Sequence, residues 1–207
     1  MDVLTVNPGM LYKTVDFGKF KSEEEKDFFA SLFLVAGAIG NEISCQNIGF
    51  LGEKSSKIIE IIKSVGGEIE EKEGLLRAKK NANMRGTNIS CTGYEDILPF
   101  IALLCAFCIG ESRLTGVKNT KYVSLLRGIA AEFSHLGVYT KQTVDGLIIH
   151  GGQVLRGDGA YVWNSAPLAM ALLVGASRSE GEMRICGVLE IEEDKRFEKL
   201  LKILIGE

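Results

Sequence analysis

The chain of 207 residues has little of what marks membrane, secreted or nucleic-acid-binding proteins. No apolar run approaches the roughly 18 to 20 uninterrupted residues that a membrane-spanning helix needs. The first residues lack the basic segment and apolar core of a signal peptide. Lysine and arginine total 24 against 27 acidic residues, which gives a formal net charge of −3, whereas a nucleic-acid-binding domain normally carries a basic stripe. We therefore expect a cytoplasmic protein that binds neither a membrane nor a nucleic acid.

Histidine and cysteine are also scarce, with two and five residues respectively. An odd number of cysteines, mostly inside apolar segments, is typical of buried reduced thiols rather than of a disulfide framework. Cys105 and Cys108 form a C-x-x-C pair late in an expected helix, away from the helix N-terminus that would lower a thiol pKa. No second Cys/His pair completes a zinc site. We expect neither a metal nor a cofactor.

An internal repeat is the most informative feature that the chain does have. Two octets, GESRLTGV at 110–117 and GEMRICGV at 181–188, start 71 residues apart, and each follows an apolar helical stretch. A weaker copy starts at Gly40, which is 70 residues before Gly110. Three copies at one period indicate a single supersecondary unit that is used three times.

The middle copy shows what this unit contains. Residues 97–109 are apolar almost all round, which predicts a helix buried on most sides, with Asp96 as its N-cap and Pro99 in its first turn. After this helix, the spacing of the apolar residues changes to that of a strand at 112–117 and then to that of an amphipathic helix at 122–135. A hairpin of 138–141 with 146–150 follows.

These patterns predict an α/β fold of three-fold pseudo-symmetric β-α-β-α-β-β repeats. Because the apolar helices need burial on every side, they should lie inside and the sheets outside, as in an inside-out, barrel-like α/β lobe. We expect one domain over 1–207, with repeats at about 22–91, 92–160 and 161–207. The N-terminal strand, residues 3–6, is expected to complete the last repeat.

Five segments resemble motifs of the enolpyruvyl transferase family, which includes EPSP synthase (3-phosphoshikimate 1-carboxyvinyltransferase). They are FLVAGAI at 33–39, QNIG at 46–49, DILPFIALL at 96–104, RGIAAEFSHLG at 127–137 with DGLII at 145–149, and PLAMA at 167–171. The chain is similar to the C-terminal lobe of that family over about residues 24–204. The resemblance implies an activity that moves an enolpyruvyl group from phosphoenolpyruvate to shikimate 3-phosphate.

The resemblance also implies where the site should lie. Family members hold their anionic substrates at helix N-termini, where backbone N–H groups and the helix dipole favour negative charge. Asp96 matches the catalytic aspartate of the family. Arg127 matches the arginine of its K-E-T/S-D-R segment, so the resemblance implies substrate binding for Arg127, Ser124 and Lys121.

Other positions of the family motifs have lost their chemistry. Val123 and Ser124 stand where the family has lysine and glutamate, and Ala166 and Pro167 stand where it has histidine and arginine. The lysine near the family's C-terminus would fall at Ile191, inside an acidic stretch. Valine, alanine and proline at these positions carry neither a proton nor a charge for the reaction.

Two functional hypotheses follow. In the favoured one, the chain is a catalytically degenerate lobe that acts as a binding or assembly module, with Phe28, Phe29 and the acidic residues 190–194 lining an interface. In the alternative, it is the catalytic lobe of a split or oligomeric enolpyruvyl transferase. Either reading predicts a homodimer or a companion lobe. Lys54 and Ser55, at an expected helix start, either bind an anion or cap the helix, and capping is the favoured role.

Overall fold

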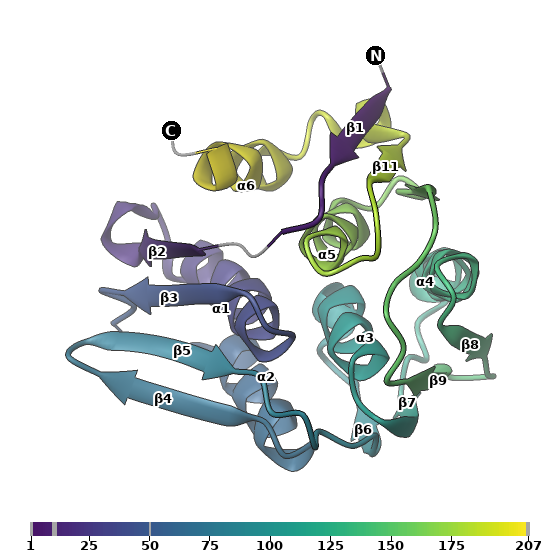
Figure 1. Cartoon of the computed structure of the whole chain (residues 1–207), viewed down its shortest axis with the longest axis horizontal. Coiled ribbons are helices and arrows are strands. Elements are labelled where there is room, and N and C mark those ends of the chain that lie inside the picture. The colour runs from purple at the N-terminus through teal and green to yellow at the C-terminus, as the bar shows by residue number, and fades with distance from the viewer. Residues whose placement is uncertain (1, 10–11, 50, 206–207) are drawn as a thin grey trace.

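The computed structural model describes residues 2–9, 12–49 and 51–205, which fold into three small sheets around a group of helices (Figure 1). None of the helices in these ranges is both long enough and apolar enough to cross a bilayer.

The first sheet has the strand order β2-β3-β5-β4. β2 and β3 are parallel, and the other two pairings are antiparallel. The elements of this part are β2 (Tyr12–Asp16), α1 (Glu23–Ala38), β3 (Glu42–Gln46), α2 (Glu53–Ser64), β4 (Glu68–Lys72) and β5 (Leu75–Lys79).

The second sheet has the same topology, with the order β6-β7-β9-β8 and again one parallel and two antiparallel pairings. This shared topology agrees with a repeated unit, while the three-fold pseudo-symmetry stays a prediction. The elements are β6 (Asn88–Ser90), α3 (Leu98–Ala106), β7 (Gly110–Thr115), α4 (Val123–His135), β8 (Tyr139–Gln142) and β9 (Leu147–Gly151).

The third sheet joins both ends of the chain. β1 pairs antiparallel with β11, so the N-terminal strand lies at one edge of this sheet, and β10 pairs parallel with β11 on its other edge. The elements are β1 (Val3–Val6), β10 (Gly159–Tyr161), α5 (Ala166–Ala176), β11 (Met183–Cys186) and α6 (Lys195–Ile205).

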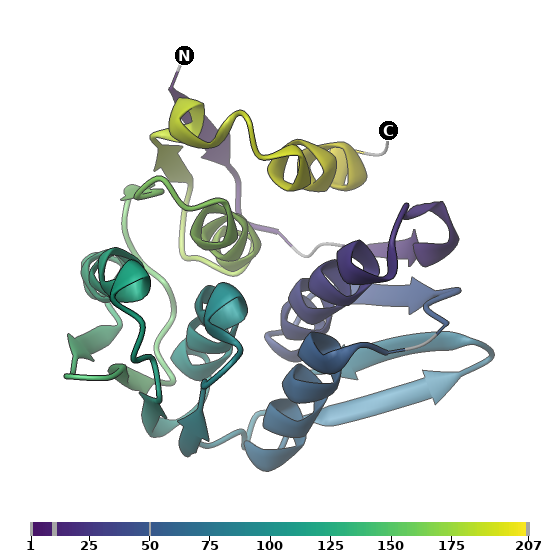
Figure 2. The ribbon, with the colours of Figure 1, turned by 180° about the vertical axis from the view of Figure 1, so that it is seen from behind.

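Three helices, α1, α3 and α5, form the centre of the molecule, and the sheets lie around them (Figures 1 and 2). Every residue of α3 is buried, and so is every residue of α5 except Pro167. The stretch of α1 from Phe28 to Ala38 is also buried. Burial of one large apolar side chain contributes about 1.5–3 kcal/mol. The sequence correctly predicted buried helices and outer sheets, because helices that are apolar all round leave no face for solvent.

The structure corrects the sequence-based picture in two respects. The three sheets are separate and open in the described ranges, so the expected barrel-like closure is absent; connecting segments, rather than hydrogen-bonded edge strands, join one sheet to the next. The opening strands β2, β6 and β10 were also not located from the sequence. β6 and β10 have three residues each, which is too short for a period of two to be recognised.

Candidate functional site

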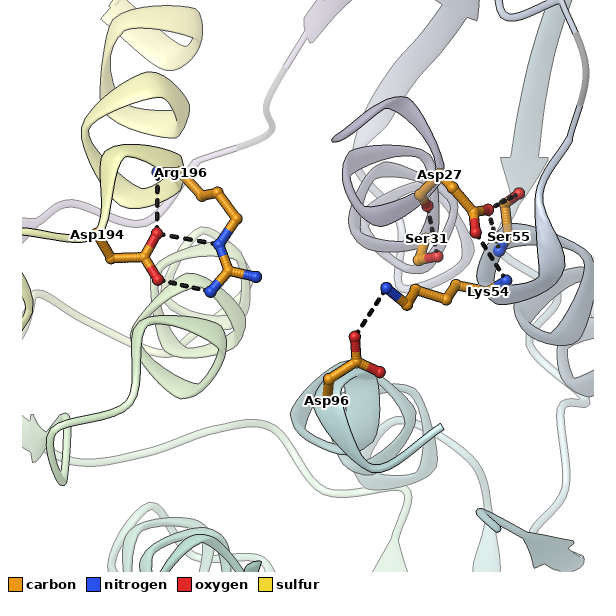
Figure 3. Close-up of polar contacts among 7 residues, drawn as sticks. All are labelled: Asp27, Ser31, Lys54, Ser55, Asp96, Asp194 and Arg196. Atoms are coloured by element: carbon orange, nitrogen blue, oxygen red, sulfur yellow. Dashed lines mark hydrogen bonds and ion pairs between the residues drawn. The ribbon is translucent and has the colours of Figure 1, made fainter. Parts of the chain in front are cut away.

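Charged side chains from several helix starts lie at one end of the molecule. Figure 3 shows Asp27 near the start of α1, Lys54 at the start of α2, Asp96 just before α3 and Arg196 at the start of α6. The resemblance placed the site at helix N-termini, and these four residues define the candidate site.

Asp27 closes the N-terminus of α2. Its carboxylate accepts hydrogen bonds from the backbone N–H groups of Lys54 (3.0 Å) and Ser55 (2.8 Å), and from the Ser55 hydroxyl (2.5 Å). The N-cap is Gly52, and a Cβ at that position would lie 2.2 Å from Cγ of Asp27. The carboxylate of α1 therefore takes the place of a capping side chain, and it occupies the helix end that Lys54 and Ser55 could have offered to an anion.

Asp96 does not cap α3, which corrects the sequence-based expectation. It lies in a 3-10 turn, Glu95–Ile97, and α3 begins at Leu98 without a side-chain cap. Instead, Oδ2 of Asp96 lies 2.9 Å from Nζ of Lys54, and the two side chains are 36% and 22% exposed. Pro99 is in the first turn of α3, as predicted. Asp96 is exposed enough to act as an acid or a base, but its carboxylate is engaged in the ion pair with Lys54.

Arg196 forms the second ion pair of this end. Its guanidinium donates to both oxygens of Asp194, at 3.0 and 2.6 Å, and lies 4.6 Å from the ring centre of Phe28. Burial of Asp194 opposes ionisation, but the hydrogen bonds from Arg196 outweigh it and lower the pKa of that carboxyl. The bond to Asp194 raises the pKa of Arg196, and the charge of Asp96 adds to this effect. Asp194 and Arg196 are therefore both ionised near neutral pH.

Phe28 and Phe29, which were expected to line an interface, lie in the core instead. Phe28 and Phe29 are 2% and 0% exposed and belong to the core, where their rings pack edge to face. The prediction that they line an exposed interface is wrong, because the Phe28 ring packs against Phe100 of α3 and the Phe29 ring packs against Phe20 and Phe33.

The predicted substrate-binding residues lie at the start of α4. Lys121 precedes the helix and lies 4.7 Å from the ring centre of Tyr122, while Ser124 and Arg127 are in its first two turns. Lys121, Ser124 and Arg127 are exposed. In the described chain, no hydrogen bond or ion pair joins any of them to Asp96, so their role in binding stays a prediction.

The start of α5 is shaped by strained backbone. Trp163 and Asn164 have φ of 51° and 50°, a region that costs about 1–2 kcal/mol for a residue with a side chain. Nε1 of Trp163 donates to Glu132 (2.7 Å), and the Asn164 amide donates to Glu190 (3.1 Å). Ser165 then caps α5 by accepting from the amide of Leu168. Two carboxylates thus hold the turn that leads into the helix.

The charges at the candidate site largely satisfy one another. A cavity of about 320 Å³ beside Lys54 is also lined by Glu23, Glu24, Asp27 and Glu53. A bound phosphate or carboxylate would have to draw Lys54 away from Asp96. In the described ranges, no three histidine, cysteine or acidic side chains are grouped so that they could hold a metal ion.

The sequence missed most of this arrangement. Asp27, Asp194 and Arg196 were not singled out as site residues, and Lys54 was noted only at a helix start. The signal that could have found Asp27 is the glycine at 52, which leaves the start of α2 without a side-chain cap and therefore requires a hydrogen-bond partner from another element.

Comparisons with known proteins agree on one family. The family model for EPSP synthase (3-phosphoshikimate 1-carboxyvinyltransferase) matches residues 27–198. The 3-phosphoshikimate 1-carboxyvinyltransferase of Methanococcus vannielii is 31% identical over 79% of this chain and 39% of its own length. That of Pyrococcus furiosus is 28% identical over 98% of this chain and 49% of its own length. The chain thus spans less than half the length of these relatives.

Solved structures show the same fold. EPSP synthase from Acinetobacter baumannii has a TM-score of 0.65 at 19% identity, over 87% of this chain and 45% of its own. The enolpyruvyl transferase NikO from Streptomyces tendae has a TM-score of 0.67 at 15% identity, over 86% of this chain and 42% of its own.

Proposed function

Because this chain belongs to the EPSP synthase (3-phosphoshikimate 1-carboxyvinyltransferase) family, we propose that it is one lobe of a two-lobed assembly, and that by itself it binds or assembles rather than catalyses. The companion lobe would come from another chain, from a second copy, or from the remainder of a longer chain. The ligand of the complete two-lobed assembly would be an anionic small molecule, with phosphoenolpyruvate and shikimate 3-phosphate as the first candidates.

The observation that carries this proposal is the ion pair between the Asp96 carboxylate and Lys54. Enolpyruvyl transfer needs groups that give and take protons, and cations that hold phosphate and carboxylate. Here Lys54 lies 2.9 Å from Asp96, and Arg196 is bound to Asp194. Both cations of the candidate site are therefore engaged by carboxylates, and few groups remain for the chemistry.

The proposal is tested by measuring phosphate release from phosphoenolpyruvate in the presence of shikimate 3-phosphate. We expect no release above background from the purified chain alone. In calorimetric titration with shikimate 3-phosphate, any heat should be the same for the wild type and for Arg196→Gln, since the candidate site of the lobe alone offers an incomplete set of cations. Turnover by the chain alone, or a micromolar affinity for shikimate 3-phosphate that is lost in Arg196→Gln, would overturn the proposal.

A catalytic lobe of a split or oligomeric enolpyruvyl transferase is the second candidate, because Asp96 is retained just before α3 and Lys54 is within ion-pair distance of it. In this case, phosphate release should appear when a companion lobe is added. Asp96→Asn should abolish it, and Glu182→Gln, which changes an exposed glutamate, should not. If the mixed lobes release no phosphate, this second candidate is excluded and the first remains.

A further inference from the structure

The first sheet opens at one end. β3 and β5 share two residue pairs, at Cys45 and Gln46 of β3, whereas β7 and β9, which have the same place in the second sheet, stay paired at five positions. Where β3 and β5 are no longer paired, a cavity of about 330 Å³ is lined by Glu42 and Ile43 of β3 and by residues 77–79 of β5. A part of the sheet that is closed in its counterpart is therefore hollow here.

This cavity is strongly basic. Its cationic lining residues are Arg77, Lys79, Lys80 and Arg178. Glu42 is the one carboxylate among the described lining residues, and Glu70, on the neighbouring strand, lies within 2.6 Å of Nε of Arg77 and 2.9 Å of Nζ of Lys79. Four cations against two carboxylates leave a local formal charge of +2, in a chain whose net charge is −3. The cavity gathers positive charge that the rest of the molecule lacks.

Two of the four cations form no ion pair with any residue that the structure describes. Arg178 follows α5 and reaches over the end of α1, where a Cβ on Gly40 would lie 3.4 Å from Cζ of Arg178 and 3.0 Å from Cδ of Lys80. Nε of Arg178 is buried and has no hydrogen-bond partner in the described ranges. Neither Arg178 nor Lys80 forms an ion pair with a described residue. A buried donor without a partner is costly, and the fork of a guanidinium matches two oxygens of a phosphate group.

We propose that this cavity binds a compact phosphate-bearing anion, with Arg178 donating to two of its oxygens and Lys80 supplying a second positive charge. The volume lies within the roughly 300–1,000 Å³ of small-molecule sites. The cavity lies where α1 ends, whereas Lys54, Asp96 and Arg196 lie where helices begin. The site is therefore separate from the candidate functional site and does not rest on the proposed function.

Capping of α1 is the simpler role for these cations, since positive charge is favourable at a helix C-terminus. A capping guanidinium would donate to a carbonyl oxygen in the last turn of α1. No such hydrogen bond from Arg178 is present among the described residues, and its Nε is without any acceptor. Capping therefore does not satisfy the group that an anion would satisfy.

The test is a titration of the ¹⁵N-labelled chain with inorganic phosphate, followed by NMR, with sodium chloride adjusted to hold the ionic strength constant. We expect saturable shifts of the Gly40 amide and of the Arg178 Nε–H signal. Arg178→Gln and Lys80→Gln should each raise the dissociation constant about tenfold or more, because each removes a charge-assisted contact. Lys141→Gln, which removes an exposed lysine of β8 on the second sheet, should leave it unchanged.

Two results would overturn the proposal. One is the absence of saturable shifts at Gly40 and Arg178 with the wild-type chain. The other is phosphate binding that is unchanged in Lys80→Gln or in a folded Arg178→Gln; its loss in Arg196→Gln would then place the anion at the helix starts. Lys80 is exposed, so Lys80→Gln decides the matter even where Arg178→Gln perturbs folding.

Discussion

At the residue scale, Glu132 is an acidic residue that is buried, with an exposed fraction of 7%. Its two carboxylate oxygens accept from Nε1 of Trp163 (2.7 Å) and from the amide of Tyr161 (2.9 Å). Burial raises the pKa of Glu132 above its ordinary value of 4.5, although the bond from Trp163 and the nearby His135 act in the opposite direction. The turn before α5 therefore depends on a carboxylate whose ionisation the interior disfavours.

This raised pKa predicts a pH dependence of stability. Because the folded state binds the Glu132 proton more tightly than the unfolded state, the protonated group stabilises the fold below pH 4.5, and this contribution is lost as the pH rises through the folded pKa. Glu132→Gln has no such proton. The free energy of unfolding of the wild type, relative to Glu132→Gln, should fall between pH 4.5 and neutrality, as measured by urea denaturation.

Glu182→Gln is the control for this experiment, since Glu182 is exposed. The difference between wild type and Glu182→Gln should stay flat over the same pH range. Parallel stability curves for the wild type and Glu132→Gln would contradict the prediction.

At the scale of elements, α2 depends on a side chain from α1. Gly52→Ala should destabilise the protein, because the added Cβ would lie 2.2 Å from Cγ of Asp27 and would displace the carboxylate that caps the helix. Loss of a helix N-cap costs about 0.5–2 kcal/mol. We expect a decrease of this size in the free energy of unfolding, measured by urea denaturation.

Gly9→Ala is the matched control, since no heavy atom lies within 4 Å of the position of its Cβ. Asp27→Ala should reproduce the loss seen in Gly52→Ala, and the double variant should lose little more, because both changes remove the same cap. Full additivity of the two losses would show that Asp27 does not act through α2.

At the scale of the whole molecule, apolar side chains remain exposed near the start of α5. Tyr161, Trp163 and Leu189 are 39%, 37% and 54% exposed. Exposed apolar patches commonly mark interaction surfaces. The homodimer expected from the sequence should therefore use this face, and light scattering at high protein concentration should give twice the mass of one chain.

Leu189→Ser should shift this equilibrium towards the monomer, because it removes the most exposed of the three side chains. Val144→Ser changes a fully exposed residue at the turn between β8 and β9, and should leave the mass unchanged. A wild-type chain that stays monomeric at every concentration would contradict the prediction.

The sequence by itself determined which segments form helices, that the apolar ones lie inside, and that one strand–helix unit recurs. These properties follow from periodicity within about ten neighbouring residues, so local pattern is enough to read them. The amphipathic helix at 122–135 and the hairpin of 138–141 with 146–150 were placed from the sequence in this way.

Only the tertiary structure decided how the charges are distributed. Asp27 caps a helix that starts 26 residues later, Lys54 pairs with Asp96 on another helix start, and Arg178 meets Lys80 over the end of α1. No periodicity encodes such pairs, because ion pairs and caps depend on distances of about 3 Å between elements that are remote in sequence. The repeat thus specified the scaffold, whereas packing determined which carboxylate each cation binds and where positive charge is left uncompensated.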